Sequence, residues 1–144
     1  MSTELYKKIV FDRSKSRRFY GKPEGSADSA FLSNPLCGDE ITVYASRDGA
    51  YRYEAYGCAI CMCSADLMAE TLTGKTPAEA KETINDFLAL IEQGSPLSER
   101  LTEFQDDYTA VAKVREFPSR LKCATLPWLA AEQCLKAEPG ENPQ

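Results

Sequence analysis

Histidine is absent from the 144 residues of this sequence. Histidine supplies the general base of Ser-His-Asp and Cys-His catalytic sites and is the most common metal ligand in proteins. Its absence excludes those catalytic arrangements, and it excludes every metal site that needs an imidazole from this chain. Any nitrogen ligand must therefore come from a partner protein.

Long apolar runs are also absent. No stretch approaches the roughly 18 consecutive apolar residues of a membrane span, and residues 1–4 lack the basic start and apolar run of a signal peptide. The net charge of −5 gives an overall field that repels nucleic acid and anionic membranes. We therefore expect a cytoplasmic protein that binds neither nucleic acid nor a membrane.

The sequence is rich in cysteine, with six residues. In a reducing compartment, metal binding or thiol chemistry explains cysteines better than structural disulfides do. Cys37 and Cys58 are 21 residues apart, and Cys123 follows 65 residues later. This spacing differs from that of a zinc finger or ribbon, whose ligands come in close pairs. Together with Asp39, the three cysteines would form a set that suits a soft, thiophilic metal.

The residue pattern predicts a small antiparallel sheet and several helices. The expected strands are residues 29–33, 40–46 and 50–56, and the last two are joined through an Asp48-Gly49 turn. The expected helices are residues 4–12, 58–72, 77–93, 108–114, and a last helix from Thr125 or Leu126 to about Lys136. We expect one domain over residues 1–137 and a disordered tail over residues 138–144.

Capping signals mark several of these helix ends. Thr3 is the expected N-cap of the first helix, and the segment 76–79 (Thr-Pro-Ala-Glu) is a capping box with proline at the first helical position. Pro127 is expected in the first turn of the last helix. Between the first helix and the sheet, five basic residues form either a solvated segment or a docking site for an acidic partner: Arg13, Lys15, Arg17, Arg18 and Lys22.

Two cysteines are expected at helix starts. Cys58 follows Gly57 at such a start, and Cys123 is expected just ahead of another. The positive end of the helix dipole favours the thiolate, which binds metal and attacks sulfur. The alternative is that both are small buried apolar residues. Asp39 is either an oxygen ligand or a turn residue that bonds its own backbone.

Further residues near these blocks have candidate roles. Arg120 is a candidate partner of Asp39 that would tune how readily Asp39 leaves a metal. Cys61 lies three residues after Cys58, on the same helix face, and would be an extra ligand or a resolving thiol. Cys63 and Cys134 are expected in the core.

With these blocks laid out, the chain resembles the U-type iron-sulfur assembly proteins, the family of IscU, SufU and the N-terminal domain of NifU. The resemblance covers roughly residues 4–137. Lys122 stands where IscU-like scaffolds carry histidine, and residues 94–117 correspond to an extra segment of SufU-like members, so the SufU branch is favoured. The matching residues are Asn34-Pro35, Cys37-Gly38-Asp39, Gly57-Cys58, Ser64-Ala65, Met68 and Arg120-Leu121-Lys122-Cys123-Ala124.

The resemblance implies an α/β (α+β) IscU-like fold, with a three-stranded, mostly antiparallel sheet and helices packed on one face. It also implies a Zn²⁺ site formed by Cys37, Asp39, Cys58 and Cys123. SufU-like proteins take persulfide sulfur from a PLP-dependent, SufS-like cysteine desulfurase, whose histidine enters the zinc site as a cysteine is released. Cys37, on a loop beside a glycine, is the expected sulfur acceptor, with Cys123 next.

Three functions remain open at this point. The first is a zinc-dependent sulfurtransferase that passes sulfur to a downstream iron-sulfur scaffold or to apo-proteins. The second is an IscU-like scaffold that binds iron and assembles a transient [2Fe-2S] cluster on Cys37, Asp39, Cys58 and Cys123. Cys61 modestly favours this scaffold because it would complete an all-thiolate set. The third is a structural zinc domain whose metal only supports folding.

Overall fold

The computed structural model describes residues 1–136, so the expected tail at 138–144 lies outside the described residues. The helices and strands follow in the order α1 (Thr3–Lys15), β1 (Ala27–Asn34), β2 (Asp39–Ser46), β3 (Tyr51–Tyr56), α2 (Ala59–Leu72), α3 (Pro77–Leu88), α4 (Gln105–Ala112) and α5 (Leu121–Lys136). A π-helical turn, Ala89–Gln93, extends α3, and 3-10 turns lie at Glu99–Phe104, Lys113–Glu116 and Pro118–Arg120. Within residues 1–136, none of the helices is both long enough and apolar enough to cross a membrane.

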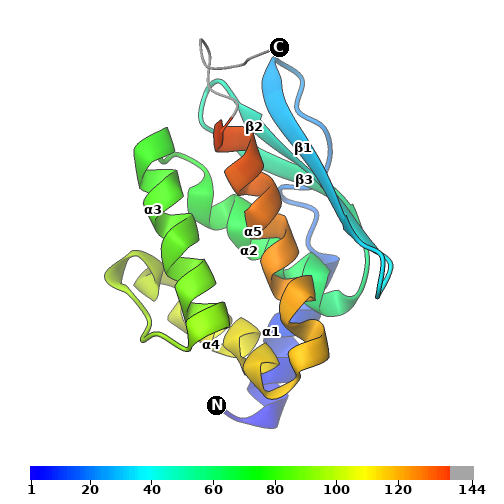
Figure 1. The fold of residues 1–144 in the computed structure, drawn as a ribbon, viewed down its shortest axis with the longest axis vertical. Helices are drawn as coiled ribbons and strands as arrows, with labels where there is room; N and C mark the ends of the chain where they lie inside the picture. Colours follow the sequence, from blue (N-terminus) through cyan, green and yellow to red (C-terminus); the bar gives the residue numbers. More distant parts are fainter. Residues whose placement is uncertain (137–144) are drawn as a thin grey trace.

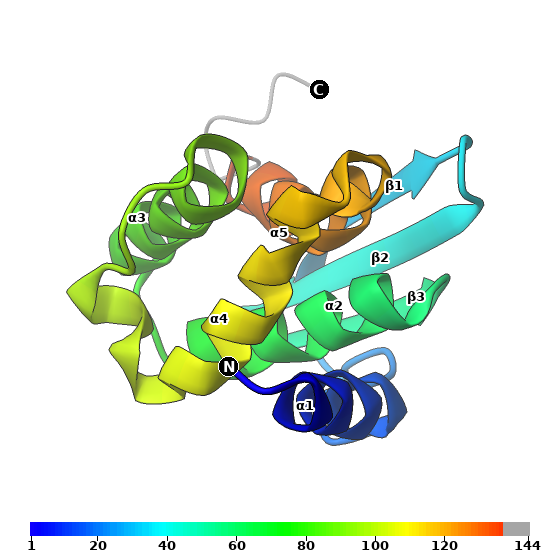
Figure 2. The same cartoon turned by 90° about the horizontal axis from the view of Figure 1, so that it is seen from below.

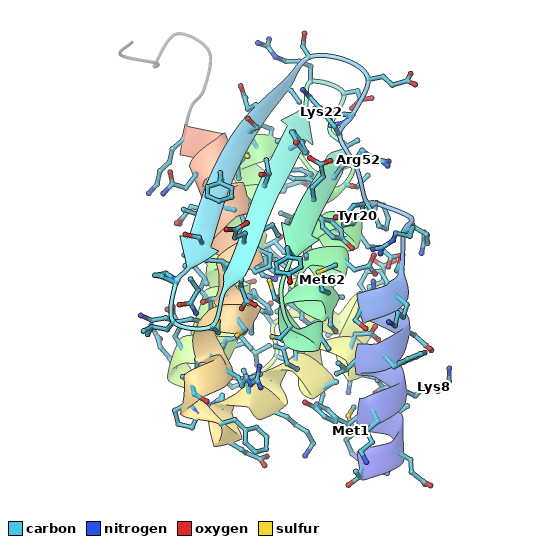
Figure 3. The ribbon with its side chains drawn as sticks, turned by 90° about the vertical axis from the view of Figure 1, so that its right-hand side faces the viewer. Met1, Lys8, Tyr20, Lys22, Arg52 and Met62 are labelled. Atoms are coloured by element: carbon cyan, nitrogen blue, oxygen red, sulfur yellow. The ribbon has the colours of Figure 1, made fainter. Side chains whose placement is uncertain are left out.

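The three strands form one sheet in the order β1-β2-β3, and both pairings are antiparallel. The helices cover one face of this sheet (Figures 1 and 2), and the other face is open (Figure 3). Side chains of β2 alternate between the two faces of the sheet. Asp39, Ile41 and Val43 are buried on the face that the helices cover, and Glu40 is exposed on the open face. The predicted fold class, and the hairpin turn between β2 and β3, are confirmed.

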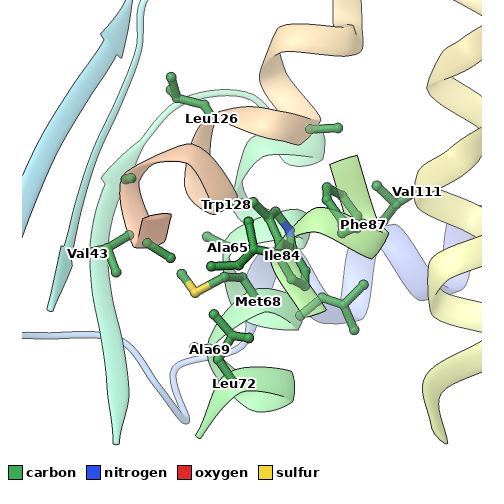
Figure 4. Close-up of a cluster of buried hydrophobic side chains, with 14 of the residues drawn as sticks. Val43, Ala65, Met68, Ala69, Leu72, Ile84, Phe87, Val111, Leu126 and Trp128 are labelled. Carbon is green, nitrogen blue, oxygen red and sulfur yellow. The ribbon is translucent and has the colours of Figure 1, made fainter. Parts of the chain in front are cut away.

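The core lies between the sheet and α3, with α2 running through it (Figure 4). Helix α2 is buried on nearly all sides, as its lack of a polar face predicts. Trp128 of α5 stacks on Phe87 of α3, with ring centroids 4.1 Å apart and planes at 10°. The predicted capping box opens α3, since Thr76 and Glu79 each accept the other's backbone N–H.

The last helix begins earlier than the sequence pattern predicts. Helix α5 starts at Leu121, and Pro127 lies inside the helix and not in its first turn. Proline lacks the N–H that would bond to the carbonyl of Cys123 four residues before it. The helix nevertheless continues through this point, because residues 123–128 are all buried and packing outweighs the lost bond. Cys123 therefore lies within the first turn of α5.

Helix α1 also differs in detail from its prediction. Its N-cap is Ser2 and not Thr3, because the Ser2 hydroxyl accepts the N–H of Leu5 at 3.1 Å. Of the apolar residues on its expected inner face, only Val10 is buried, while Leu5 is 38% exposed. Apolar burial alone therefore does not explain how α1 is held.

Arg13 supplies the missing attachment. Its side chain is only 12% exposed and pairs with Asp66 and Glu70 of α2, both at 2.8 Å, and with Asp107 of α4 at 2.7 Å. The expectation that the whole basic segment is either solvated or free to dock a partner is therefore wrong for Arg13. The side chain of Arg18 is 69% exposed, and its guanidinium pairs with the Glu70 carboxylate at 3.0 Å. Arg13 thus attaches α1 to α2 and α4, and Arg18, in the segment after α1, adds a second contact to α2.

Candidate metal centre

The turn between β1 and β2 presents Cys37 to solvent. The backbone carbonyl of Asn34 accepts the N–H groups of Cys37 at 3.2 Å and Gly38 at 2.9 Å, and its side chain accepts the N–H of Leu36 at 3.2 Å. Gly38 has a φ of 77°, in the left-handed region that glycine adopts without a Cβ penalty. This turn is what leaves Cys37 exposed.

Asp39 lies at the start of β2, opposite Asn34, so the strand begins one residue before the predicted start at residue 40. It is fully buried, and its Oδ1 accepts the backbone N–H of Cys58 at 3.0 Å. Cys58 is the N-cap of α2, and its side chain makes no cap hydrogen bond. The backbone N–H of Cys58, at the start of α2, thus fixes one oxygen of Asp39. The Cys58 sulfur does not cap the helix and is available for other contacts.

Three of the four predicted ligands meet in one cluster. The Sγ of Cys37 lies 3.0 Å from Oδ2 of Asp39 and 3.5 Å from Sγ of Cys123. Within residues 1–136 this is the only group whose ligand atoms all lie within 4.8 Å of one another as a metal site requires. Cys58 is outside that compact group, although its thiol interacts with the thiol of Cys123.

Gly57 has a role that the sequence analysis did not assign. A Cβ at this position would lie 2.9 Å from Cγ and 3.2 Å from Cα of Asp39, closer than real Cβ contacts normally are. Glycine is therefore what allows the chain entering α2 to pass against the buried carboxylate. The Gly-Cys pair in the sequence was the available signal, but only the fold shows which side chain is opposite it.

The cluster without a metal holds a charge on Asp39 and a proton on the thiol of Cys123. Burial opposes ionisation of Asp39, but hydrogen bonds from the thiols of Cys123 and Cys37 and from the Cys58 N–H outweigh it and lower the pKa of Asp39. Burial, followed by the Asp39 carboxylate and the adjacent thiols, raises the pKa of Cys123 well above the usual thiol value. The expectation that the helix start makes Cys123 a ready thiolate is therefore wrong for the metal-free cluster.

Arg120 is exposed at the mouth of the cluster and interacts with the thiols of Cys58 and Cys123, which raise its pKa. Within the described residues it makes no direct ion pair with Asp39. Its charge still contributes to lowering the pKa of Asp39, after burial and the hydrogen bonds from Cys123, Cys37 and Cys58. A hollow of about 420 Å³ lies beside it, lined by Tyr6, Cys58, Ala59, Ile60, Val114, Phe117, Ser119 and Arg120.

The remaining cysteines are buried, as predicted for Cys63 and Cys134. Cys61 and Cys63 are 0% exposed and Cys134 is 2% exposed. The charges that act on Cys61 come from Asp39, Cys58 and Cys37, while those on Cys63 come from Arg13, Asp107 and Asp66. The two α2 cysteines thus face different surroundings, and Cys61 is on the side of the cluster.

The donor atoms of this cluster fit a tetrahedral thiophilic metal. Sulfur atoms that share a zinc ion at about 2.3 Å are about 3.8 Å apart in a tetrahedral site. The 3.5 Å between the Cys37 and Cys123 sulfurs is close to that separation. The buried carboxylate supplies an oxygen donor on the same side, and Cys58 is adjacent to Cys123. The arrangement has the chemistry of a metal centre with mixed sulfur and oxygen ligands.

Comparison with protein families agrees with this geometry. Residues 5–124 match the family model described as the NifU-like N-terminal domain. The chain belongs to the NifU-like N-terminal domain family. The match includes the turn at Cys37, the start of α2 and the first turn of α5, so all the elements of the cluster lie inside it.

Relatives in this family carry names from iron-sulfur cluster assembly. The chain is 32% identical over 142 residues to the zinc-dependent sulfurtransferase SufU of Bacillus subtilis, covering 96% of this chain and 94% of SufU. It is 30% identical over 140 residues to the assembly scaffold protein IscU of Thermotoga maritima, covering 92% and 93%. These two identities are too similar to separate a SufU function from an IscU function.

A solved structure shows the same fold. The crystal structure of an iron-sulfur cluster assembly scaffold protein for the SUF system from Fervidobacterium islandicum AW-1 aligns with a TM-score of 0.80 at 31% identity. The alignment covers 94% of this chain and all of that one. The N-terminal NifU-like protein of Brucella abortus, at 24% identity and a TM-score of 0.77, agrees in fold. The chain is thus a member of the IscU/SufU group of iron-sulfur cluster assembly proteins.

Proposed function

We propose that this protein is a SufU-like, zinc-dependent sulfurtransferase that accepts persulfide sulfur on Cys37. The observation that carries the proposal is an asymmetry in the cluster, because Cys37 is exposed while Asp39 and Cys123 are buried. A sulfur acceptor must be reached by a partner, and a stable metal site needs ligands that stay in place. The four ligands proposed are Cys37, Asp39, Cys58 and Cys123.

The transfer step needs only Cys37 and a persulfide on the partner. The Cys37 thiolate attacks the outer sulfur of the partner's cysteine persulfide, and the sulfur-sulfur bond of the partner breaks. The partner's cysteine leaves as a thiolate, and Cys37 becomes a persulfide. Electrons and atoms balance, so no external oxidant or reductant is required.

Zinc, when bound, supplies a positive charge that keeps the cysteine ligands as thiolates at neutral pH. Asp39 balances part of that charge, and the Cys58 N–H fixes its orientation. Arg120, beside Cys58 and Cys123, adds a positive charge at the mouth of the cluster and favours the approach of an anionic persulfide. Gly38 lets Cys37 turn outward.

The proposed sulfur donor is a PLP-dependent cysteine desulfurase of the SufS type, and the proposed recipients are a downstream scaffold or apo-proteins in the cytoplasm. The absence of histidine from this chain suits a partner that contributes its own histidine to the zinc site. The hollow between Tyr6 and Arg120 lies next to Cys58 and offers an apolar surface with one cation for the approaching partner.

The test combines metal content with sulfur transfer on one anaerobic sample. We expect about one zinc per chain and a several-fold rise in desulfurase turnover, with the rise lost in Cys37→Ala. Cys134→Ala is the matched control, since Cys134 is a buried thiol whose sulfur contacts the backbone carbonyl of Val43 in the middle of β2. Iron with acid-labile sulfide, and stimulation that survives loss of zinc, would overturn the sulfurtransferase.

The second candidate is a scaffold that assembles a [2Fe-2S] cluster on the same ligands. Cys61 favours it, because a fourth cysteine on the cluster side of α2 would provide the all-thiolate set that such clusters commonly use. Its signature is a brown, air-sensitive protein after reconstitution. A third outcome, a Cys37 variant that unfolds and binds no metal, would indicate a structural zinc domain.

A further inference from the structure

The open face of the sheet carries large apolar side chains at the end where the Cys37 turn lies. An antiparallel sheet that faces water on one side normally presents polar residues there. Phe31 of β1 is nevertheless 59% exposed and Tyr56 of β3 is 77% exposed, and Leu36, in the turn that joins β1 to β2, is 88% exposed. Apolar side chains that gather at one place on a surface mark contact with another molecule.

Two carboxylates share this face with the aromatic rings. One row across the sheet consists of Phe31, Thr42 and Glu54, which are paired strand to strand. The next row places Glu40 of β2 opposite Tyr56 of β3. Residues paired across an antiparallel sheet point to the same face, so Glu40 and Glu54 are diagonal neighbours on adjacent strands.

These side chains line an open hollow of about 240 Å³, and Tyr20, beside β3, forms its far wall (Figure 3). The Tyr20 hydroxyl donates to the carbonyl of Ala55 at 3.2 Å, which fixes the ring. The guanidinium carbon of Arg17 lies 4.5 Å from the centre of the same ring. The chain itself thus places one guanidinium against an aromatic ring of this hollow.

Neither carboxylate in the hollow has a cation of its own. In residues 1–136, no lysine or arginine lies within ion-pair distance of Glu40 or Glu54, since the ion pairs of this part of the chain all involve other carboxylates. The Tyr44 hydroxyl donates to Oε1 of Glu54 at 2.6 Å and holds that carboxylate in place. The second oxygen of Glu54 and the carboxylate of Glu40 remain available to a ligand.

A guanidinium matches this combination of groups better than an ammonium does. Its planar fork offers several N–H donors to carboxylates, and its faces stack on aromatic rings. Arginine and aromatic residues are also enriched in the cores of protein–protein interfaces, where they supply much of the binding energy. Charge complementarity therefore favours an arginine of a partner protein as the occupant.

We propose that the hollow formed by Tyr20, Phe31, Glu40, Glu54 and Tyr56 is a docking site for a partner protein that inserts an arginine side chain. The guanidinium lies between the two exposed rings and pairs with both carboxylates. The partner then covers the open face of the sheet beside the Cys37 turn. This inference goes beyond the proposed function, because it requires neither a bound metal nor sulfur transfer.

The test titrates the natural protein with N-acetyl-L-argininamide and follows the backbone amide signals by NMR. The matched probe is N-acetyl-L-citrullinamide, which has nearly the same shape without the charge. The citrulline probe should bind about 10-fold more weakly, because it lacks the ion pairs and the cation–π contact. We expect saturable shifts from the arginine probe that centre on Phe31, Thr42, Glu54 and Tyr56.

Variants separate the carboxylates from the rings. Glu40→Gln combined with Glu54→Gln should weaken binding of the arginine probe by about 10-fold. Phe31→Leu removes the ring and keeps an apolar side chain, so it should weaken binding by about 2–5-fold. Glu24→Gln is the matched control, since Glu24 is an exposed carboxylate that precedes β1 at the opposite end of the sheet, and it should bind as the natural protein does. Thermal unfolding checks that each variant is folded.

Three results would overturn the proposal: shifts spread over the acidic surface, equal binding of the two probes, or an unchanged affinity when both glutamates are replaced. Sedimentation velocity tests a second copy of this chain as the alternative occupant. If the natural protein dimerises and Tyr56→Ser makes it monomeric, the open face is covered by the protein itself, and the proposal of a basic partner is wrong.

Discussion

At the scale of single residues, the candidate centre depends on differences in burial among similar side chains. Six thiols share one chemistry, but only Cys37 is exposed, Cys58 is half-buried, and the other four are buried. Two glycines have conformational and steric roles: Gly38 adopts a left-handed conformation and Gly57 gives room to Asp39. Sequence spacing identified the cysteines, whereas their unequal exposure depends on the completed fold.

Thiol alkylation should separate these classes. In metal-free protein at pH 8, iodoacetamide is expected to modify Cys37 first, because it is exposed. Burial raises the pKa of Cys63 and of Cys134 to about 12 each, so only about one molecule in 10⁴ carries either thiolate at that pH. Peptide mass spectrometry over time gives the order. Early labelling of Cys134, while the protein remains folded, would contradict the burial described here.

A methyl group at Gly57 tests the close approach to Asp39. Gly57→Ala should lower the free energy of unfolding by about 1–3 kcal/mol, because the new Cβ must displace buried atoms of Asp39. Gly25→Ala is the control, since no atom lies within 4 Å of its Cβ position. Urea denaturation of metal-free protein measures both changes. Equal effects from the two substitutions would show that Asp39 moves aside without cost.

At the scale of secondary-structure elements, two buried polar contacts join helices that carry candidate ligands. Ser64 of α2 donates to the carbonyl of Ala124 in α5 at 2.6 Å and accepts the indole N–H of Trp128 at 3.0 Å. This link lies next to Cys123 and joins Ser64 to α5 on both sides of Pro127, at Ala124 and at Trp128. It fixes the start of α5 against α2, the helix that begins after Cys58.

Ser64→Ala removes the link between α2 and α5. The indole N–H of Trp128 and the Ala124 carbonyl would lose this partner in a fully buried place, at a cost of about 1–3 kcal/mol in unfolding free energy. Trp128 is the single tryptophan, so its fluorescence reports the change directly. Thr102→Ala, at an exposed hydroxyl bonded to Glu99, should change stability by less than about 0.5 kcal/mol. A red-shifted emission is expected only for the Ser64 variant.

The ion pairs of α1 give a second test at this scale. Arg13→Met leaves three carboxylates facing one another, one of them on Asp66 at 3% exposure, and should cost about 3–5 kcal/mol. Arg18→Met is the control, since its side chain is 69% exposed and such pairs contribute about 0–1 kcal/mol. Chemical denaturation compares the two variants. A loss for Arg13→Met no larger than that for Arg18→Met would mean that apolar contacts hold α1.

Local signals in the sequence predicted these elements unevenly. The capping box at Thr76, the Asp48-Gly49 turn and the helix over residues 58–72 are strong local signals, and all three predictions are confirmed. The start of α5 was not predictable locally, because proline normally marks a first turn and only tertiary packing allows Pro127 further inside. Arg13 also looked solvated, since its carboxylate partners lie 53 to 94 residues away along the chain.

At the scale of the whole molecule, the proposed ligands come from the β1–β2 turn, the start of α2 and the first turn of α5. The sequence predicted this set of residues, of which the structure groups Cys37, Asp39 and Cys123. It did not predict the internal geometry of the group, such as the buried position of Asp39 at the start of β2 or the contacts of Arg120. Those features depend on how the sheet packs against the helices. A metal bound to this set would therefore couple three distant segments to one another.

Metal removal should reveal that coupling as a change in global stability. With zinc at 100 times its dissociation constant, binding adds about 2.7 kcal/mol, which corresponds to about 5–10 °C in melting temperature for a chain of this size. Scanning calorimetry with and without a chelator measures the difference. In Cys123→Ala the difference should largely disappear, and an unchanged shift in that variant would place the metal elsewhere.

The position of Cys123 in the last helix also has a consequence for biosynthesis. A ribosome releases the turn with Cys37 and the start of α2 well before α5, so a nascent chain at that stage carries part of the ligand set without Cys123. The cluster described here forms only after α5 has emerged and docked between α2 and the sheet. Acquisition of the metal would accordingly be a late step in maturation, and an unfinished chain would be a poor competitor for cellular zinc.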